Sequence, residues 1–181
     1  MFSIQINLTL QTKRYKLKIL LMKQNIIKNG IIASVAAIGY ALLFYYTRKE
    51  WIFTGLYTFS SLIIYLFFMH QAAKKVAKED FNVVLKAAFG VFVLANAIYY
   101  AFDYALFNII DPSLVDIQKE EMIQYYSSAS KSVEEQNTLI QGIQDAQYHQ
   151  FKGISFSFAK GAIGGFGLAI LITYLLKRND R

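Results

Sequence analysis

The stretch GIIASVAAIGYALLFYY, residues 30–46, decides the fold class of this chain. It contains no charged residue, and the charge-free segment extends from Asn29 to Thr47. A helix needs about 20 mainly apolar residues to cross the ~30 Å hydrocarbon core of a bilayer. The stretch therefore predicts a membrane-spanning helix.

Three further apolar runs, residues 51–69, 87–110 and 154–176, have the same character. The run at 51–69 is uncharged, whereas the other two contain one charge each, Asp103 and Lys160. The chain is 55% hydrophobic, above the roughly 45–50% of soluble domains. We predict an all-α fold, a bundle of four transmembrane helices with a helical extracytoplasmic loop between the third and fourth. Residues 22–181 form this single integral membrane domain.

The basic residues predict the orientation of the bundle. They gather before the first span, between the second and third, and after the fourth: Lys13, Arg14, Lys16, Lys18, Lys23, Lys28; Lys74, Lys75, Lys78, Lys86; Lys177, Arg178, Arg181. Cytoplasmic loops carry the excess of Lys and Arg, so both termini are expected in the cytoplasm. The net charge of +7 is explained by these flanks. We therefore expect the lipid bilayer as a partner and no nucleic acid.

Residues 1–21 precede this pattern and have another. Ser3 to Gln11 alternates polar and apolar residues, which suits a strand, although no partner strand is evident. The stretch lacks the order of a signal peptide. Two alternatives stay open: translation begins at Met22 and residues 1–21 are a mis-annotated start, or they form a disordered basic tail.

The loop at residues 111–153 is the large extramembrane region, and it is acidic. Asp111-Pro112 is typical of a helix start, and Ser132 with Glu135 fits a capping box before a second helix. In the same way, Asp80 is expected to cap the third span. We expect two amphipathic helices that either pack on the membrane domain and its interface or dock a protein partner.

Charges inside a span are costly and need a reason. Asp103 and Lys160 lie at a similar depth, about 10 Å below the outer boundary at ~1.5 Å per residue. We predict an ion pair between them; the alternative is two independent groups, with Lys160 extending outward along its own stem. Asn96 lies deeper in the third span and is expected to hydrogen-bond across helices. These three residues are the intramembrane polar candidates.

The fourth span contains four glycines, Gly161, Gly164, Gly165 and Gly167. Gly161 and Gly165 make a small-xxx-small pattern that lets two helix backbones approach closely. Packing inside the bundle is favoured over a homodimer formed through this span.

Chemistry that depends on a cofactor or a nucleophile has no support in the sequence. The chain has no cysteine, which excludes thiolate catalysis and cysteine-ligated metals. His70 and His149 are predicted on opposite sides of the membrane, so they cannot share a metal or a catalytic triad. We expect no catalytic residues, no cofactor, no metal and no enzymatic activity.

The segment from Lys86-Ala87-Ala88-Phe89 to Phe107-Asn108-Ile109-Ile110-Asp111-Pro112 carries a family resemblance. Together with the acidic helix after it and a last span ending Leu175-Leu176-Lys177-Arg178, it resembles the bacterial membrane family catalogued as domain of unknown function 4199. The most specific motif is the Asn-x-x-Asp-Pro at residues 108–112. The resemblance implies a four-span protein of the bacterial inner membrane without an assigned activity. It also implies a start near Met22.

Two functions follow as expectations. The first is a non-enzymatic structural or accessory component that docks a protein partner through the acidic periplasmic loop, residues 111–153. The alternative is a small transporter or channel subunit that uses Asp103, Lys160 and Asn96. A transporter predicts a water-accessible cavity that joins these residues, whereas an accessory protein predicts a tightly packed interior.

Overall fold

The computed structural model describes residues 2–129, 132–146 and 148–179. Arg181 of the predicted cytoplasmic tail lies outside this range. The described residues form helices without a strand: α1 (Phe2–Thr47), η1 (Lys49–Phe53), α2 (Gly55–Lys74), α3 (Phe81–Ala105), η2 (Leu106–Ile110), α4 (Ser113–Ala129), α5 (Val133–Asp145) and α6 (Phe151–Asn179). The predicted all-α class is confirmed.

Four helices are long and apolar enough to span a membrane: Leu17–Thr47, Gly55–Lys74, Phe81–Ile110 and Phe151–Arg178. The second starts later than the apolar run at 51–69 predicts. Trp51 lies in η1, a 3₁₀ turn, and α2 begins only after Thr54, whose hydroxyl accepts a hydrogen bond from the Tyr57 amide at 3.4 Å. Hydropathy does not separate an apolar turn from an apolar helix, so the boundary was misplaced.

The third span starts inside the preceding loop, as expected. Asp80 occupies the N-cap position of α3, but its carboxylate makes no capping hydrogen bond. The backbone carbonyl of Asp80 accepts from the amides of Val83 and Val84 instead.

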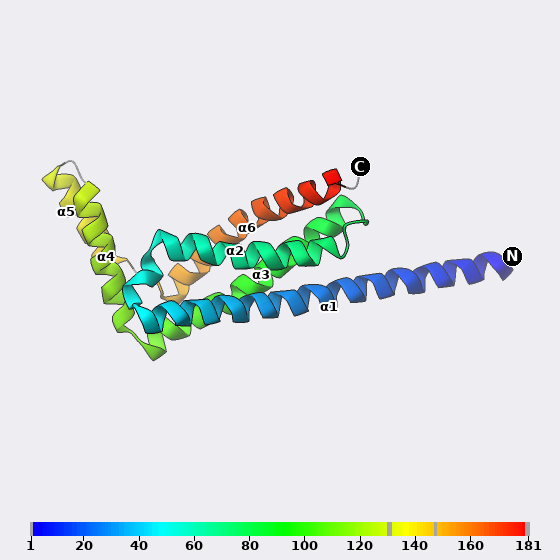
Figure 1. The fold of residues 1–181 in the computed structure, drawn as a ribbon, viewed down its shortest axis with the longest axis horizontal. Helices are drawn as coiled ribbons and strands as arrows, with labels where there is room; N and C mark the ends of the chain where they lie inside the picture. Colours follow the sequence, from blue (N-terminus) through cyan, green and yellow to red (C-terminus); the bar gives the residue numbers. More distant parts are fainter. Residues whose placement is uncertain (1, 130–131, 147, 180–181) are drawn as a thin grey trace.

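The chain N-terminal to the first span is helical. Helix α1 runs without a break from Phe2 to Thr47, and Figure 1 shows it extending well past the other helices. The strand-like alternation of Ser3–Gln11 is therefore not realised as a strand. Whether translation begins at Met22 stays a prediction, to be checked by the intact mass of the native protein.

Helix α3 is the centre of the bundle and packs against α1, α2 and α6. Its contact with α1 is close at two glycines, one on each helix. A Cβ on Gly30 would lie 2.8 Å from Cδ2 of Leu94, and one on Gly90 would lie 3.0 Å from Cγ2 of Ile26. Small residues at these crossings let the helix backbones approach.

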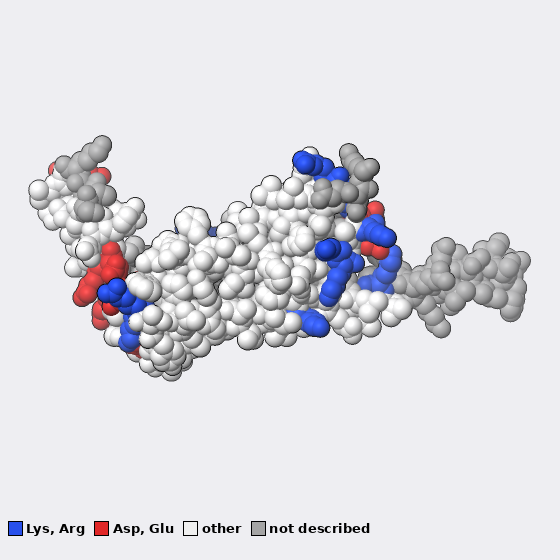
Figure 2. Space-filling model, in the orientation of Figure 1, with Lys and Arg blue, Asp and Glu red and all other residues white. Residues whose placement is uncertain are grey.

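The bundle has two dissimilar ends. We call the end with the α2–α3 connection and the C-terminal part of α6 the basic end, and the end that carries η1, η2 and α4 the loop end (Figure 1). At the basic end Lys177 donates to the carbonyl of Ala77 at 2.7 Å, and Lys18 pairs with Glu79 at 2.6 Å. Figure 2 shows most of the visible Lys and Arg at the basic end, and a patch of Asp and Glu at the loop end with a smaller basic group beside it.

Helices α4 and α5 form a hairpin at the loop end. Leu114 of α4 is fully buried against Leu106 and Phe107 of η2. The capping role of Ser132 is confirmed, because its hydroxyl accepts from the Glu135 amide at 3.2 Å. Among the described helices α5 packs only on α4, and Figure 1 shows the hairpin projecting away from the bundle.

Candidate functional site

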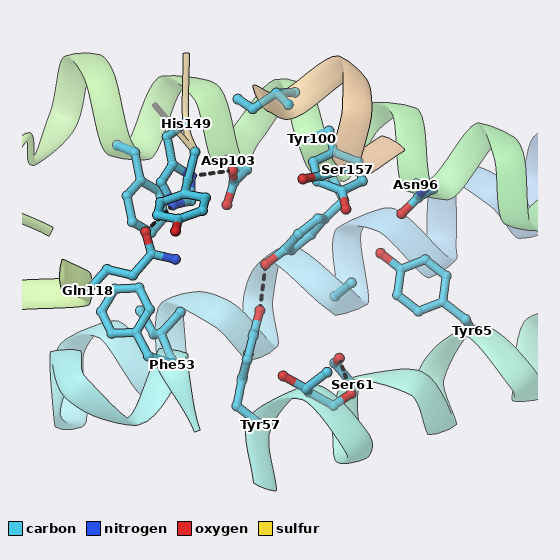
Figure 3. A pocket seen from close by; sticks show the side chains of 17 residues that line it. Phe53, Tyr57, Ser61, Tyr65, Asn96, Tyr100, Asp103, Gln118, His149 and Ser157 are labelled. Atoms are coloured by element: carbon cyan, nitrogen blue, oxygen red, sulfur yellow. Dashed lines mark hydrogen bonds and ion pairs between the residues drawn. The ribbon is translucent and has the colours of Figure 1, made fainter. Parts of the chain in front are cut away.

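A cavity of about 400 Å³ lies between the helices at the loop end, and it is partly open to the outside. All four spanning helices, η1, η2, α4 and the segment before α6 contribute to its wall. The lining is aromatic and polar: Ala37, Ile52, Phe53, Tyr57, Thr58, Ser61, Tyr65, Asn96, Tyr99, Tyr100, Asp103, Phe107, Gln118, Tyr148, His149, Ile154 and Ser157. Figure 3 shows these side chains converging from facing helices.

The outer part of the cavity is organised around His149. Its Nδ1 lies 2.9 Å from Oδ2 of Asp103, and its Nε2 lies 2.9 Å from Oε1 of Gln118. The ring stacks on Phe107 with centroids 3.5 Å apart and planes 2° from parallel. Asn108 donates to the backbone carbonyl of His149 at 2.8 Å. The short segment before α6 is thereby fixed to α3, η2 and α4.

Both ring nitrogens of His149 face oxygen atoms in this arrangement (Figure 3). Neutral imidazole donates through one nitrogen, whereas imidazolium donates through both. Nδ1 can therefore donate to the Asp103 carboxylate, while Nε2 contacts the Gln118 amide, whose oxygen and nitrogen exchange on a 180° rotation.

The predicted ion pair between Asp103 and Lys160 is wrong. Asp103 binds His149, and the Lys160 ammonium lies 5.6 Å from the ring centroid of Phe156, on an exposed part of α6. The reason is helical geometry. Gly161 faces Asn96 of α3, and the preceding residue on a helix lies about 100° around the axis from it. Lys160 therefore lies at a depth similar to that of Asp103, but not on the face of α6 that meets α3.

Tyrosines form the middle of the cavity. The hydroxyls of Tyr57 on α2 and Tyr99 on α3 hydrogen-bond to each other at 2.6 Å. Nearby, the Tyr40 hydroxyl of α1 hydrogen-bonds to Ser60 of α2 at 2.6 Å. These contacts cross between helices and hold the wall in place, as polar side chains do within membranes.

Asn96 marks the inner end of the cavity. It is only 7% exposed, and its Nδ2 has no hydrogen-bond partner. The nitrogen packs against α6, where a Cβ on Gly161 would lie 3.0 Å from it. The expected hydrogen bond from this amide to another helix is absent. Figure 3 shows Tyr65 reaching toward Asn96 from α2. A buried amide nitrogen without a partner costs free energy.

Two of the four glycines in the last span serve packing. A Cβ on Gly165 would lie 2.2 Å from the Phe92 ring, and Gly161 contacts Asn96, so both let α6 approach α3. At Gly164 and Gly167 no atom from beyond the neighbouring residues and backbone of the same helix lies within 4 Å of the Cβ position. The Gly161–Gly165 pattern thus acts inside the bundle. A homodimer through the span stays a prediction.

Asp111 connects three elements at the rim of the loop end. Its carboxylate accepts hydrogen bonds from Tyr45 at 3.0 Å, from Lys49 and from Ser113. The hydrogen bond from Lys49, followed by that from Ser113, lowers the pKa of Asp111 from 3.8 to about 2. Asp111 thus joins α1 and η1 to the start of α4, beyond the helix-start role expected for it.

Sequence reasoning identified Asp103 and Asn96 but missed His149 and Gln118. The wall formed by α3 could have been predicted, because Tyr99 and Tyr100 lie three and four residues after Asn96 and four and three before Asp103, spacings that place the four residues on one helix face. His149 had no such signal, since it comes from a turn rather than a helix face. Among the described residues no group of three His, Asp or Glu side chains could hold a metal ion.

Four apolar helices, a polar cavity at one end and a projecting helical hairpin define a multi-pass helical membrane protein. The chain belongs to the family described as protein of unknown function (DUF4199), whose model matches residues 28–178. This confirms the resemblance noted in the sequence. No curated protein and no solved structure matches the chain.

Proposed function

We propose that this protein binds a small molecule in its loop-end cavity and acts as a small transporter or transporter subunit of the bacterial inner membrane. The observation that carries the proposal is the cavity, which joins Asp103 to Asn96. The transporter hypothesis requires such a space, whereas a purely structural protein requires a packed interior. Lys160, the third residue of that hypothesis, has no part in the cavity.

The distribution of packing favours a carrier over an open channel. Beyond Asn96 the helices close around a buried core that includes Met69, Ala72, Val84 and Ala88, all fully buried. The pocket at the basic end that is lined by Phe81, Tyr174, Lys177 and Arg178 shares no lining residue with the loop-end cavity. Access from one side at a time is the property that distinguishes carriers from pores.

A non-enzymatic role accompanies this proposal. His149 is the candidate base of the cavity, but its nitrogens are engaged by Asp103 and Gln118. No serine or tyrosine hydroxyl in the described part of the chain forms a hydrogen bond with it, as an activated nucleophile would.

The proposed orientation places both termini in the cytoplasm and the cavity mouth in the periplasm. It follows from the basic residues around the basic end (Figure 2) and the positive-inside rule. A reporter fused after Arg181 should be active in the cytoplasm. Periplasmic activity of the same fusion would overturn this orientation.

The absence of cysteine from the sequence allows a direct test of the cavity. Single cysteines are introduced by Ser61→Cys on α2 and Ser157→Cys on α6, both in the cavity wall. We expect both to react with a membrane-impermeant maleimide added from the loop side of sealed vesicles. The matched control is Ala169→Cys on α6, a fully buried position that should stay unlabelled. If neither Ser61→Cys nor Ser157→Cys is labelled, the proposal is refuted.

A second candidate function rests on the α4–α5 hairpin. Helix α5 packs on α4 alone among the described helices and leaves Val133 and Leu139 exposed. These features support docking of a protein partner through residues 111–153. A photoreactive residue at Leu139 should then give one discrete adduct in cells, whereas the same residue at Ala169 gives none. A smear of products, or no adduct, would count against docking.

A further inference from the structure

We propose that the cavity receives the headgroup of an uncharged, single-tailed amphiphile from the bilayer, and that the tail lies in an apolar groove between α3 and α6. The inference rests on the proposed function and names the ligand class of the same site. Three observations carry it: the groove, the residues it shares with the cavity, and the charges of the wall.

The groove has a volume of about 450 Å³ and a wall of mostly apolar residues. Helix α3 contributes Ala97, Tyr100, Ala101 and Tyr104; α6 contributes Phe151, Ile154, Ser155 and Phe158. All of them belong to segments long and apolar enough to span the membrane. An apolar groove at this depth faces lipid chains, and small residues such as Ala97 and Ala101 leave room for one.

The groove and the cavity are adjacent, because Tyr100 and Ile154 line both. These two side chains form the partition between the lipid-facing groove and the polar interior. A molecule with a polar head and one flexible tail can occupy both spaces at once. A water-soluble metabolite would leave the groove unused.

The charges of the wall favour an uncharged head. Among the residues that the structure describes, no Lys or Arg side chain lines the cavity or the groove. The carboxylate of Asp103 is already paired with His149. An anionic head would find no free cation, and a cationic head would have to displace the imidazole from Asp103.

Hydrogen-bonding groups are available to a neutral head. The Asn96 amide lies at the inner end, with its unpartnered Nδ2 buried against α6 and Tyr65 beside it (Figure 3). A 180° rotation exchanges the amide nitrogen and oxygen, so the amide can present either of them to a headgroup in the cavity. A carbonyl or amide headgroup is thus complementary to Asn96.

The test measures protection of the cysteine in Ser157→Cys, in the full chain reconstituted in lipid nanodiscs. The probe is N-decylacetamide, which has an uncharged head and one tail. We expect it to slow maleimide labelling several-fold. Acetamide lacks the tail, decanoate is anionic and decyltrimethylammonium is cationic; each should protect much less. Equal protection by a charged amphiphile would overturn the uncharged class, and equal protection by acetamide would overturn the role of the groove.

Two variants in the Ser157→Cys background locate the binding mode. Ala101→Trp fills the groove from its exposed side, and Asn96→Leu removes the amide. Each should abolish protection by N-decylacetamide while labelling persists. Ile163→Trp, at an exposed position of α6 outside both spaces, is the matched control and should keep protection. If Ser157→Cys is labelled but never protected, this inference fails and the proposed function stands. If it is not labelled at all, the proposed function fails first.

Discussion

The two ends of this bundle use the same helices for different purposes. From the middle of the bundle toward the basic end, α3 and α6 meet through Val91, Phe92, Ala169 and Ile172, which belong to one buried cluster. At the loop end α3 presents Asn96, Tyr99 and Asp103, and α6 presents Ser157, to a cavity.

The difference between the two regions shows which part of the fold is stabilised by packing and which part is less stable because it encloses a cavity. Tight apolar packing supplies dispersion contacts that a cavity lacks. The loop end replaces such packing with hydrogen bonds such as Tyr57–Tyr99 and Asp103–His149. Natural proteins break packing rules mainly at functional sites, so this asymmetry itself supports placing the function at the loop end.

The largest effect is expected at the closest helix contact. Gly165→Ala places a Cβ 2.2 Å from the Phe92 ring, a separation that forces α6 or the ring to move. Overpacking of this kind costs about 1–3 kcal/mol. Thermal unfolding in detergent micelles should show a clear loss of stability.

The matched control for that substitution lies one residue earlier. Gly164→Ala makes the same chemical change where no atom from beyond the neighbouring residues and backbone of the same helix lies within 4 Å of the new Cβ. It should leave the midpoint of unfolding almost unchanged. If Gly164→Ala destabilises the protein as much as Gly165→Ala does, the loss of stability does not come from contact with Phe92. It then comes from an effect that is common to both glycines.

A somewhat smaller loss is expected when the network at the loop end is broken. Asp103→Leu removes the acceptor that faces Nδ1 of His149, and loss of a hydrogen bond to a charged group costs about 1.5–3 kcal/mol. Since the site is partly open, we expect the loss in free energy of unfolding to lie in the lower part of this range. Unfolding of the variant is compared with that of His149→Phe and of the double variant.

The double variant decides which residue is the partner of Asp103. The effects of Asp103→Leu and His149→Phe should be less than additive, because both remove one contact. Asp103→Leu and Lys160→Met should instead be additive. Coupling of Asp103 to Lys160 without coupling to His149 would restore the ion pair that the structure excludes.

Asn96→Leu should have the opposite sign. The substitution removes a buried nitrogen without a partner, and an unsatisfied buried donor costs about 1–3 kcal/mol. Leucine has a similar shape, so we expect unchanged or slightly increased thermal stability, together with loss of ligand protection. A marked loss of stability would show that the amide has a structural role, and the cavity would then lose its proposed inner contact.

The fold could be predicted from sequence because bilayer physics acts residue by residue. A run such as 30–46 must be a helix wherever it lies in a membrane, since its backbone groups have no other partners there. The start of the second span could not be predicted equally well. Trp51 and Ile52 are as apolar as a helix would be, and only the cap at Thr54 separates turn from helix.

The candidate site was less predictable, because it depends on which residues meet. The depth of Asp103 followed from its position in the third span. Its partner did not, because His149 reaches it only through the fold of the α4–α5 hairpin and the turn before α6. The Gly161–Gly165 pattern was readable, but only the structure shows that Gly164 and Gly167 face open space.

The smallest effect concerns the rim of the loop end, where Asp111 joins α1, η1 and α4. Lys49 and Ser113 hold the pKa of Asp111 at about 2, below its usual 3.8. A lowered folded-state pKa contributes stability that is fully present above the unfolded value and is lost as the pH falls through the folded value. Asp111→Asn should therefore cost at most about 1 kcal/mol near neutral pH, as expected for a group at the surface. The difference from the parent protein should shrink as the pH falls from about 4 to about 2. Thermal unfolding followed by Trp51 fluorescence across this pH range measures both curves, with Asp116→Asn, at an exposed position of α4, as the control.

If the difference in stability between Asp111→Asn and the parent protein stayed constant down to about pH 2, the carboxylate of Asp111 would not be what fixes α4 to the bundle. The rim would then depend on the apolar contacts of Leu114 alone.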